Sequence, residues 1–226
     1  MENIDFAFEN GQIRIDGYPD AVKLICLSDQ KSRRISDLGL HKSDLEHSLD
    51  CLVEISKLSE SEKRNGLIGV VLWEQAIVYF LKCFGSSMSR FQLDFEKIFR
   101  SDSGAKVAFE YFKNLRNKHL VHDENSFAQS LTGAIINSSS SKRKVTKIVN
   151  SVVKSQTLSL GNYNNLKLLL SRTHDWVIGQ FDELCDRVTD DLEKRTYSEL
   201  MAFPNLTFRV PEISDVERNR GEKPNI

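Results

Sequence analysis

The sequence lacks the features that would identify several common classes of protein. Its four cysteines, Cys26, Cys51, Cys83 and Cys185, include no CxxC pair, which argues against a zinc site built from closely spaced thiolates. It has no GxxxxGK[ST] loop, GxSxG elbow or HExxH helix, so P-loop, serine-hydrolase and zincin chemistry find no support. Its 31 basic residues nearly balance 32 acidic ones, and a net charge of −1 does not by itself indicate nucleic acid or a membrane as partner.

Targeting and membrane signals are also missing. The N-terminal stretch MENIDFAFENGQ is acidic and has no basic region followed by an apolar run, so it does not have the pattern of a signal peptide. The most apolar run, residues 66–85, contains Glu74, Gln75 and Lys82, which favours a buried central helix over a membrane span. We therefore expect a cytoplasmic protein without a membrane anchor, in which Cys51 and Cys83 are buried, inert thiols.

Helical periodicity dominates the chain after residue 40. Ser43 and Glu46 have the spacing of a capping box, and a leucine-rich stripe follows them; Ser59 and Glu62 form a second box before the apolar run. Residues 104–122 predict another helix, begun by Asp102 or Ser103, which should end near His122. A stripe over residues 162–194 predicts a long final helix; its members are Leu166, Leu170, Thr173, Val177, Phe181, Leu184 and Val188.

Four or five helices of these lengths, joined by short connections, predict an all-α fold: an antiparallel bundle of four to five helices. We expect residues 1–40 to form an N-terminal extension with a possible β-hairpin around Asn10-Gly11, and residues 41–200 to form the bundle. Residues 206–226 have two prolines and little periodicity, and we expect residues 201–226 to form a flexible tail. The Ser-rich, basic segment 136–147 predicts a loop or a flexible hairpin tip, and residues 144–160 fit a helix or a strand.

The segment LRNKHLVH, residues 115–122, gathers groups that suit phosphate chemistry. An imidazole such as that of His122 titrates near neutral pH and can take a proton from a 2′-hydroxyl or give one to a leaving oxygen. The guanidinium of Arg116 can hold the charge that develops on the phosphorane. One copy is sparse for the whole task, but a two-fold dimer would bring two copies together and assign acid to one histidine and base to the other.

This segment resembles the signature of HEPN-domain proteins, an Arg usually followed by Asn, with a His four to six residues further on. Here Arg116-Asn117 is followed, after four more residues, by His122. The resemblance implies a small helical bundle that forms a homodimer, and the order of elements fits it over roughly residues 40–195. Many members are metal-independent ribonucleases of toxin–antitoxin, abortive-infection or other antiviral systems.

The resemblance also implies roles for particular residues. His122 would be the general acid/base, Arg116 the phosphate stabiliser and Asn117 a supporting residue, with no cofactor and with products that carry 2′,3′-cyclic phosphates. RNA would be the substrate, and an antitoxin or another protein would be a further partner. A non-catalytic HEPN-like module that binds a protein or RNA, and a helical interaction protein unrelated to the family, are the alternatives.

Basic residues around the motif are candidates for RNA binding. They are Lys118, His119, Lys142, Arg143 and Lys144. A basic run is also typical of a solvated loop, and cations near a helix C-terminus meet the negative end of its dipole without any further role. A second match to the motif spacing, Arg34 to His41, is set aside because it contains Gly39 and lacks a helical stripe.

Two further interpretations stay open. His119 follows Leu115 by one turn, which suits a packing histidine, while His119 and His122 together could hold a metal with Asp123 adjacent. The sequence offers no third ligand at a fixed spacing, so we expect no metal. Glu74 is either a buried carboxylate that pairs with Arg116 or an outward-facing residue.

Overall fold

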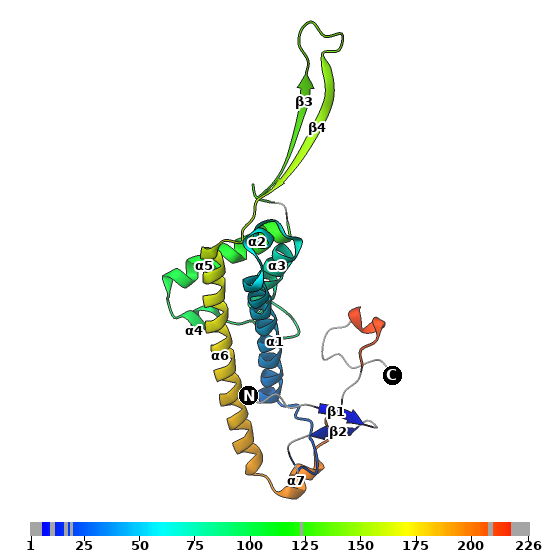
Figure 1. Cartoon of the computed structure of the whole chain (residues 1–226). Helices are drawn as coiled ribbons and strands as arrows, with labels where there is room; N and C mark the ends of the chain where they lie inside the picture. Colours follow the sequence, from blue (N-terminus) through cyan, green and yellow to red (C-terminus); the bar gives the residue numbers. More distant parts are fainter. Residues whose placement is uncertain are drawn as a thin grey trace. The chain divides into compact units, whose positions relative to one another are not determined.

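The computed structural model describes residues 6–9, 12–15, 18, 20–122, 124–207 and 210–217 (Figure 1). The chain divides into two compact units. The terminal unit consists of Met1–Ser43, Gly85–Leu93 and Thr173–Ile226, and the motif unit consists of Asp44–Phe84 and Asp94–Arg172. Arg116 and His122 lie in the motif unit, which therefore carries the candidate site.

The elements follow one another in a mostly helical order. The helices of the described residues are α1 (Gln30–Lys57), α2 (Glu60–Asn65), α3 (Leu67–Lys82), α4 (Phe95–Phe99), α5 (Ser103–Leu115), α6 (Leu160–Glu193), α7 (Tyr197–Ala202), the π-helix η1 (Arg116–Leu120) and the 3₁₀ helix η2 (Ile213–Glu217). The strands are β1 (Phe6–Glu9), β2 (Gln12–Ile15), β3 (Ala128–Ile136) and β4 (Val145–Lys154). Each of the two sheets is a pair of antiparallel strands, β1 with β2 and β3 with β4.

The expected antiparallel bundle of four to five helices is wrong. The chain is 60% helical, with seven α-helices over the described residues, and it is mostly α without being such a bundle. Three of the helices, α2, α4 and α7, have only five or six residues. Residues 145–153 are rich in β-branched side chains, which suit a pleated strand, and they pair with residues 129–136 instead of adding a helix.

The core of the motif unit forms around α3. Trp73, Ala76, Ile77 and Phe80 are buried on this helix, as its apolar sequence predicts. The Trp73 ring meets the ring of Phe112 on α5 edge to face, with centroids 6.0 Å apart. The apolar run thus forms a helix of 16 residues with one buried face, while Leu67, Ile68 and Val71 near its start are exposed.

The approach of α2 to α3 requires glycine at two positions. The Ser59–Glu62 capping box is present, but it begins the short helix α2 and not the apolar helix itself. A Cβ atom on Gly66 would lie 2.5 Å from the carbonyl oxygen of Glu62, and one on Gly69 would lie 2.8 Å from the same oxygen. Any larger residue would push the two helices apart.

Helix α5, which leads into the motif, is fixed at its start by Asp102. The Asp102 Oδ1 atom accepts a hydrogen bond from the amide of Ala105 (3.0 Å), as a capping residue does. The Oδ2 atom accepts one from Arg172 Nη1 (2.6 Å), whose guanidinium also lies 4.8 Å from the centre of the Phe99 ring. These contacts lower the pKa of the Asp102 carboxyl, first through the Ala105 amide and then through Arg172.

In the terminal unit, α1 begins well before the predicted capping box. It starts at Gln30, where Asp29 Oδ1 accepts from the Ser32 amide (2.8 Å), so Ser43 and Glu46 lie inside the helix and cap nothing. Arg34 and His41 therefore both lie in a helix. The lack of a helical stripe, which is one reason for setting this second match to the motif aside, does not mean that the segment is non-helical. Both residues pack on Phe91: His41 Nε2 lies 2.9 Å from its carbonyl oxygen, and the Arg34 guanidinium lies 3.7 Å from the ring centre.

The ends of the terminal unit also pair with each other. Strands β1 and β2 lie where the alternation predicts them, although the Asn10-Gly11 turn falls outside the described residues. The amide of Leu206 donates to the carbonyl of Leu24 (2.9 Å), and Lys23 Nζ donates to the Phe203 carbonyl (2.6 Å). The first residues of the expected flexible tail are thus held against residues 23–26.

Candidate functional site

The motif begins where α5 widens into a π-helix. Leu115, the last residue of α5, is buried, and η1 then runs over Arg116–Leu120. The amide of Val121 donates to the carbonyl of Arg116 (3.0 Å), five residues back, which is the bond that defines a π turn. Such turns are uncommon and often occur at functional sites, because the extra residue redirects the side chains that follow it.

Arg116 lies on the surface at this turn. Its Nη1 atom donates to Oδ1 of the neighbouring Asn117 at 2.8 Å, and the described residues supply no carboxylate partner. Of the two interpretations of Glu74, the pairing with Arg116 is therefore not formed. Asn117 orients one arm of the guanidinium and leaves the rest of the planar fork facing solvent, where it can hold phosphate oxygens.

His122 lies two residues beyond the π-helix and is exposed. It makes no hydrogen bond to Arg116 or to any other described residue. Lys118 is also exposed, and its carbonyl accepts from the amide of Glu124 (2.9 Å), which closes the turn after the helix. Asp123, the suggested third metal ligand, falls outside the described residues.

The two histidines of the motif occupy different environments. His119 is half-buried, its ring lies 5.7 Å from the Phe127 ring, and its Nδ1 atom is buried without a hydrogen-bond partner. It lines a cavity of about 230 Å³, together with Trp73 and Glu74 of α3. His119 therefore belongs to an inner pocket, whereas His122 belongs to the surface with Arg116.

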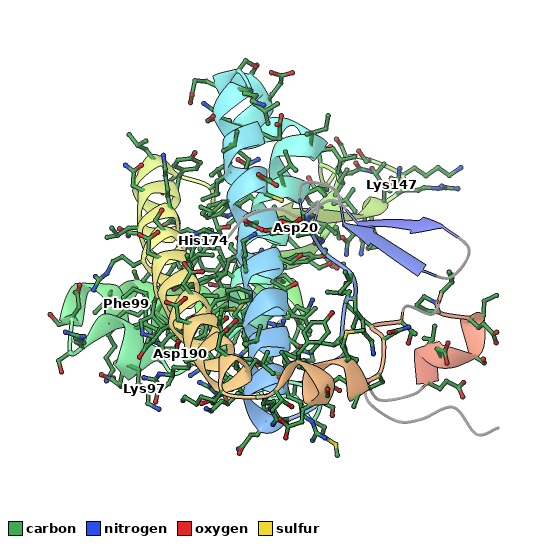
Figure 2. The ribbon with its side chains drawn as sticks, turned by 90° about the horizontal axis from the view of Figure 1, so that it is seen from below. Asp20, Lys97, Phe99, Lys147, His174 and Asp190 are labelled. Atoms are coloured by element: carbon green, nitrogen blue, oxygen red, sulfur yellow. The ribbon has the colours of Figure 1, made fainter. Side chains whose placement is uncertain are left out.

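The basic residues Lys142, Arg143 and Lys144 lie at the tip of the β3–β4 ribbon. The tip is closed by Asn137, whose amide donates to the Lys144 carbonyl (2.9 Å) and whose side chain donates to the Arg143 carbonyl (2.8 Å). In Figure 1 the ribbon projects beyond α2, α3 and α5 of its own unit, and in Figure 2 the Lys147 region lies clear of the helix side chains. Of the two interpretations of residues 136–147, a loop or a hairpin tip, the structure shows the hairpin tip.

The charge of the ribbon is one-sided. Residues 126–156 contain five basic residues and no acidic one, although the whole chain is nearly neutral. A strand of nine residues spans about 30 Å, so the tip lies roughly that far from the strand ends that adjoin the motif. The basic tip and the Arg116–His122 segment are therefore separate exposed groups of basic residues.

The ribbon also exposes apolar side chains, which the sequence pattern does not reveal. Eight of them are more than a third exposed: Leu131, Ile135, Ile136, Val145, Ile148, Val149, Val152 and Val153. They lie on both faces of the ribbon, because successive residues of a strand point to opposite faces and Val152 and Val153 are neighbours in β4. Apolar and polar residues alternate only weakly in β3, and both faces of the ribbon are exposed. The sequence therefore shows neither the alternation of a half-buried strand nor the continuous apolar run of a fully buried one.

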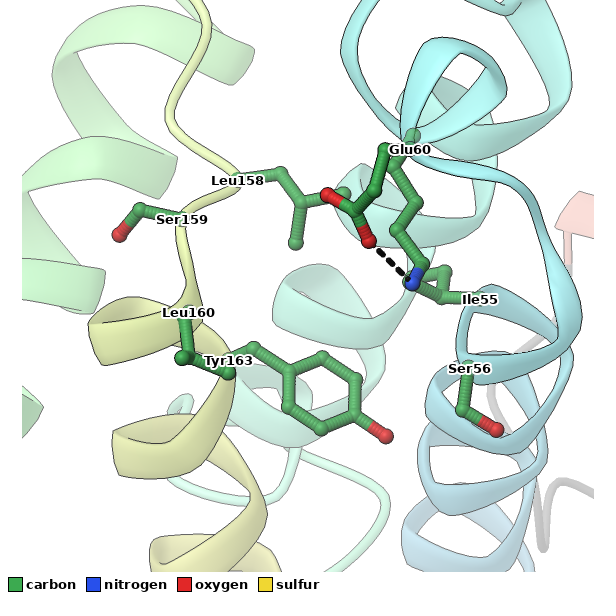
Figure 3. A pocket seen from close by; sticks show the side chains of 8 residues that line it. Ile55, Ser56, Glu60, Leu158, Ser159, Leu160 and Tyr163 are labelled. Atoms are coloured by element: carbon green, nitrogen blue, oxygen red, sulfur yellow. Dashed lines mark hydrogen bonds and ion pairs between the residues drawn. The ribbon is translucent and has the colours of Figure 1, made fainter.

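A larger cavity, of about 640 Å³, lies between the end of α1, α2 and the start of α6 in the motif unit. Figure 3 shows the Tyr163 side chain pointing from α6 toward Ile55 and Ser56 of α1. The polar groups here already have partners: Glu60 pairs with Lys63 (2.9 Å), and Tyr163 Oη donates to the Leu52 carbonyl (3.0 Å). This cavity offers few unused groups for chemistry.

The cysteines do not form a nucleophilic site. Cys51 and Cys83 are buried free thiols, as expected from their apolar helix faces. Burial raises the pKa of the Cys51 thiol and, with Asp182 and Asp186 nearby, that of Cys185. A raised pKa keeps both protonated and unreactive near neutral pH.

Comparison with protein-family models, with curated proteins and with solved structures found no match to this chain. The HEPN resemblance therefore rests on the motif and the order of elements in the sequence. Within the described part of the chain, no helix has both the length and the apolar character that a membrane span needs.

Proposed function

We propose that the protein is a metal-independent endoribonuclease of HEPN type. The single observation that carries this proposal is the state of the motif: Arg116 and His122 are both exposed, both lack an ionic partner among the described residues, and a π turn separates them. A guanidinium and an imidazole left free on the same short segment suit an anionic substrate that arrives from solution.

The reaction needs an intramolecular attack and two proton transfers. The 2′-hydroxyl oxygen of the RNA forms a bond to phosphorus while the bond to the 5′-oxygen breaks, which leaves a 2′,3′-cyclic phosphate and a 5′-hydroxyl. One His122 takes the 2′-proton, and a second His122, from the other subunit of a two-fold dimer, gives a proton to the leaving oxygen. Arg116 holds the non-bridging oxygens, and Asn117 orients it.

Binding of the RNA would extend beyond the reacting phosphate. Lys118 lies in the same exposed turn, and Lys142, Arg143 and Lys144 would hold the RNA backbone about 30 Å away through the ribbon. A role in phage defence or as a toxin, an antitoxin as partner and a cytoplasmic location follow from the resemblance alone.

The proposal is tested with labelled single-stranded RNA and the purified full-length chain in excess EDTA. We expect cleavage by the wild type and a loss of at least a hundredfold in Arg116→Ala and His122→Ala, since each removes a group that acts in the transition state. Arg187→Ala and His47→Ala are matched controls, because both residues are exposed and lie outside the motif. Equal cleavage by all five proteins, or none by the wild type, would contradict the enzymatic proposal.

A second candidate, a non-catalytic module that binds a protein partner, has one observation in its favour. The ribbon exposes apolar side chains on both faces, and an isolated two-stranded ribbon is only marginally stable until something covers it. Under this alternative, Ile148→Lys would abolish complex formation while RNA stays uncut by the wild type. Under the ribonuclease proposal, RNA is cut with or without a partner on the ribbon.

A further inference from the structure

The cavity beside the motif has the composition of a binding pocket. Its volume is about 230 Å³, and it lies within the motif unit. It is lined by Lys63, Val70, Trp73, Glu74, His119 and the segment from Lys154 to Leu158. Trp73, Val70 and Leu158 supply apolar surface, while Glu74 and His119 supply polar groups close to it.

Polar groups in this cavity have unused hydrogen-bonding capacity. The side chains of Glu74, His119, Lys154 and Gln156 make no hydrogen bond or ion pair with the described residues, and the Nδ1 atom of His119 is buried without a partner. Buried and half-buried polar groups are normally paired, because leaving them unpaired costs free energy. Glu74 and His119 are half-buried here while Lys154 and Gln156 are exposed, so the first two side chains in particular suit a ligand that supplies the missing partners.

The wall opposite α3 is held in place before any ligand arrives. Trp73 Nε1 donates to Thr157 Oγ1 (2.9 Å), and Asn162 Nδ2 donates to the Thr157 carbonyl (2.7 Å). The amide of Ser155 donates to the Phe127 carbonyl (2.7 Å). These bonds fix the segment that follows β4, so a ligand would meet a preorganised site and little free energy would be needed to order it.

The volume of the cavity and the carboxylate of Glu74 together indicate which ligand would fit. Pockets for drug-sized ligands hold about 300–1,000 Å³, so this one suits a single ring-sized group, such as one unpaired base of a longer RNA. The two oxygens of a carboxylate accept best from two adjacent donors. Guanine presents a ring N–H beside an amino group on its Watson–Crick edge, whereas adenine and cytosine place a ring acceptor beside their amino group.

We propose that this cavity is a guanine-binding subsite for the RNA. Glu74 accepts hydrogen bonds from the ring N–H and the amino group of the base, Trp73 and Leu158 give the apolar wall, and the exposed Lys154 neutralises the adjoining phosphate. His119 of the π-helix joins the subsite to the Arg116–His122 segment, so the bound base lies next to the phosphate that is cut. This inference rests on the proposed function in one respect, namely that RNA is the natural ligand.

The subsite is tested by nucleotide binding, which does not require cleavage. The full-length chain carrying Trp176→Phe, so that Trp73 is its remaining tryptophan, is titrated in EDTA with GMP, AMP, CMP, UMP and inorganic phosphate, and fluorescence and heat are measured. We expect GMP to bind at least tenfold more tightly than the other ligands. Glu74→Gln should remove that preference, while Glu110→Gln, which alters an exposed carboxylate paired with Lys113, should keep it. Circular dichroism checks that each variant is folded.

The outcomes separate this inference from the proposed function. Equal binding of the four nucleotides, binding of inorganic phosphate as tight as that of GMP, or an unchanged preference in Glu74→Gln would overturn the guanine subsite, even if RNA is cut. A GMP preference that depends on Glu74 in a protein that cuts no RNA would support the subsite and contradict the ribonuclease. If both hold, cleavage sites map next to guanines, and Glu74→Gln cuts without that preference.

Discussion

Trp73 of α3 donates a hydrogen bond from Nε1 to the hydroxyl oxygen of Thr157, and this bond ties the core of the motif unit to the segment that leaves the β-ribbon. The two residues are 84 positions apart in the sequence. Trp73 is 2% exposed, so its indole N–H is shielded from bulk water. The bond therefore both stabilises the unit and fixes one wall of the cavity beside His119.

Removal of this bond should destabilise the protein. Thr157→Val keeps the shape of the side chain but leaves the Trp73 N–H unpaired, at a cost of about 1–3 kcal/mol in the free energy of unfolding. Urea unfolding followed by tryptophan fluorescence measures the change. Thr146→Val is the matched control, since the Thr146 hydroxyl also takes part in a side-chain hydrogen bond, which it donates to Asn137, but it is exposed. A cost as small as that of the control would show that the Trp73–Thr157 bond contributes little.

The cap of α5 should make stability depend on pH. The pKa of Asp102 lies below its ordinary value of 3.8, owing to the Ala105 amide and Arg172. The folded state thus prefers the charged carboxylate, and the stabilisation is present above the unfolded pKa and is lost as the pH falls through the folded one. Asp102→Ala should lower the melting temperature by a few degrees at neutral pH, with the gap to the wild type closing in acid. A gap that is constant over the acid range would contradict this assignment.

The ribbon tip should contribute to RNA affinity through charge alone. In the triple variant Lys142→Ala, Arg143→Ala, Lys144→Ala, we expect weaker binding of single-stranded RNA of any sequence. The slope of log affinity against log salt should fall by about 0.7 for each phosphate that is no longer neutralised, or roughly 2 in total. The control is the triple alanine variant of Lys57, Lys97 and Lys113, which makes the same change in net charge at exposed, ion-paired positions. An equal effect of both variants would mean that the tip has no special role.

A composite site also requires two copies of the chain. Light scattering coupled to size exclusion should give twice the 25.9 kDa of one chain at concentrations where RNA is cut. The Lys118→Cys variant should then form a disulfide between the copies when mildly oxidised, because the motif of one subunit lies beside that of the other. An active monomer, or a dimer that is never linked through position 118, is incompatible with a shared site.

Part of this fold could be predicted from periodicity. The apolar run of α3, the helical patterns of α5 and α6, the caps at Ser59 and Asp102 and the basic hairpin tip are all local patterns, and all appear in the structure. The first turns of α1 could not be predicted in this way, because Gly39 and many charged residues interrupt its stripe and leave no amphipathic pattern. The strands of the ribbon could not be distinguished from helices in the sequence, because their apolar residues lie on both faces and face solvent.

The site was harder to predict than the helices. An ordinary helix would place His119 and His122, three residues apart, on one face. The π turn and the packing of Phe127 instead place His119 in the cavity and leave His122 outside. Likewise, Glu74 could be recognised as unusual in an apolar run, but only tertiary packing shows that it lines the cavity with His119 and makes no ion pair with Arg116.

The most direct test of the central claim is the chemistry of the RNA ends produced in EDTA. The account predicts 2′,3′-cyclic phosphate and 5′-hydroxyl ends from the wild type, none from His122→Ala, and no cut where the nucleotide before the scissile phosphate is 2′-deoxy, since the attacking oxygen is then missing. Products with 3′-hydroxyl and 5′-phosphate ends, or cleavage at the deoxy position, would contradict it.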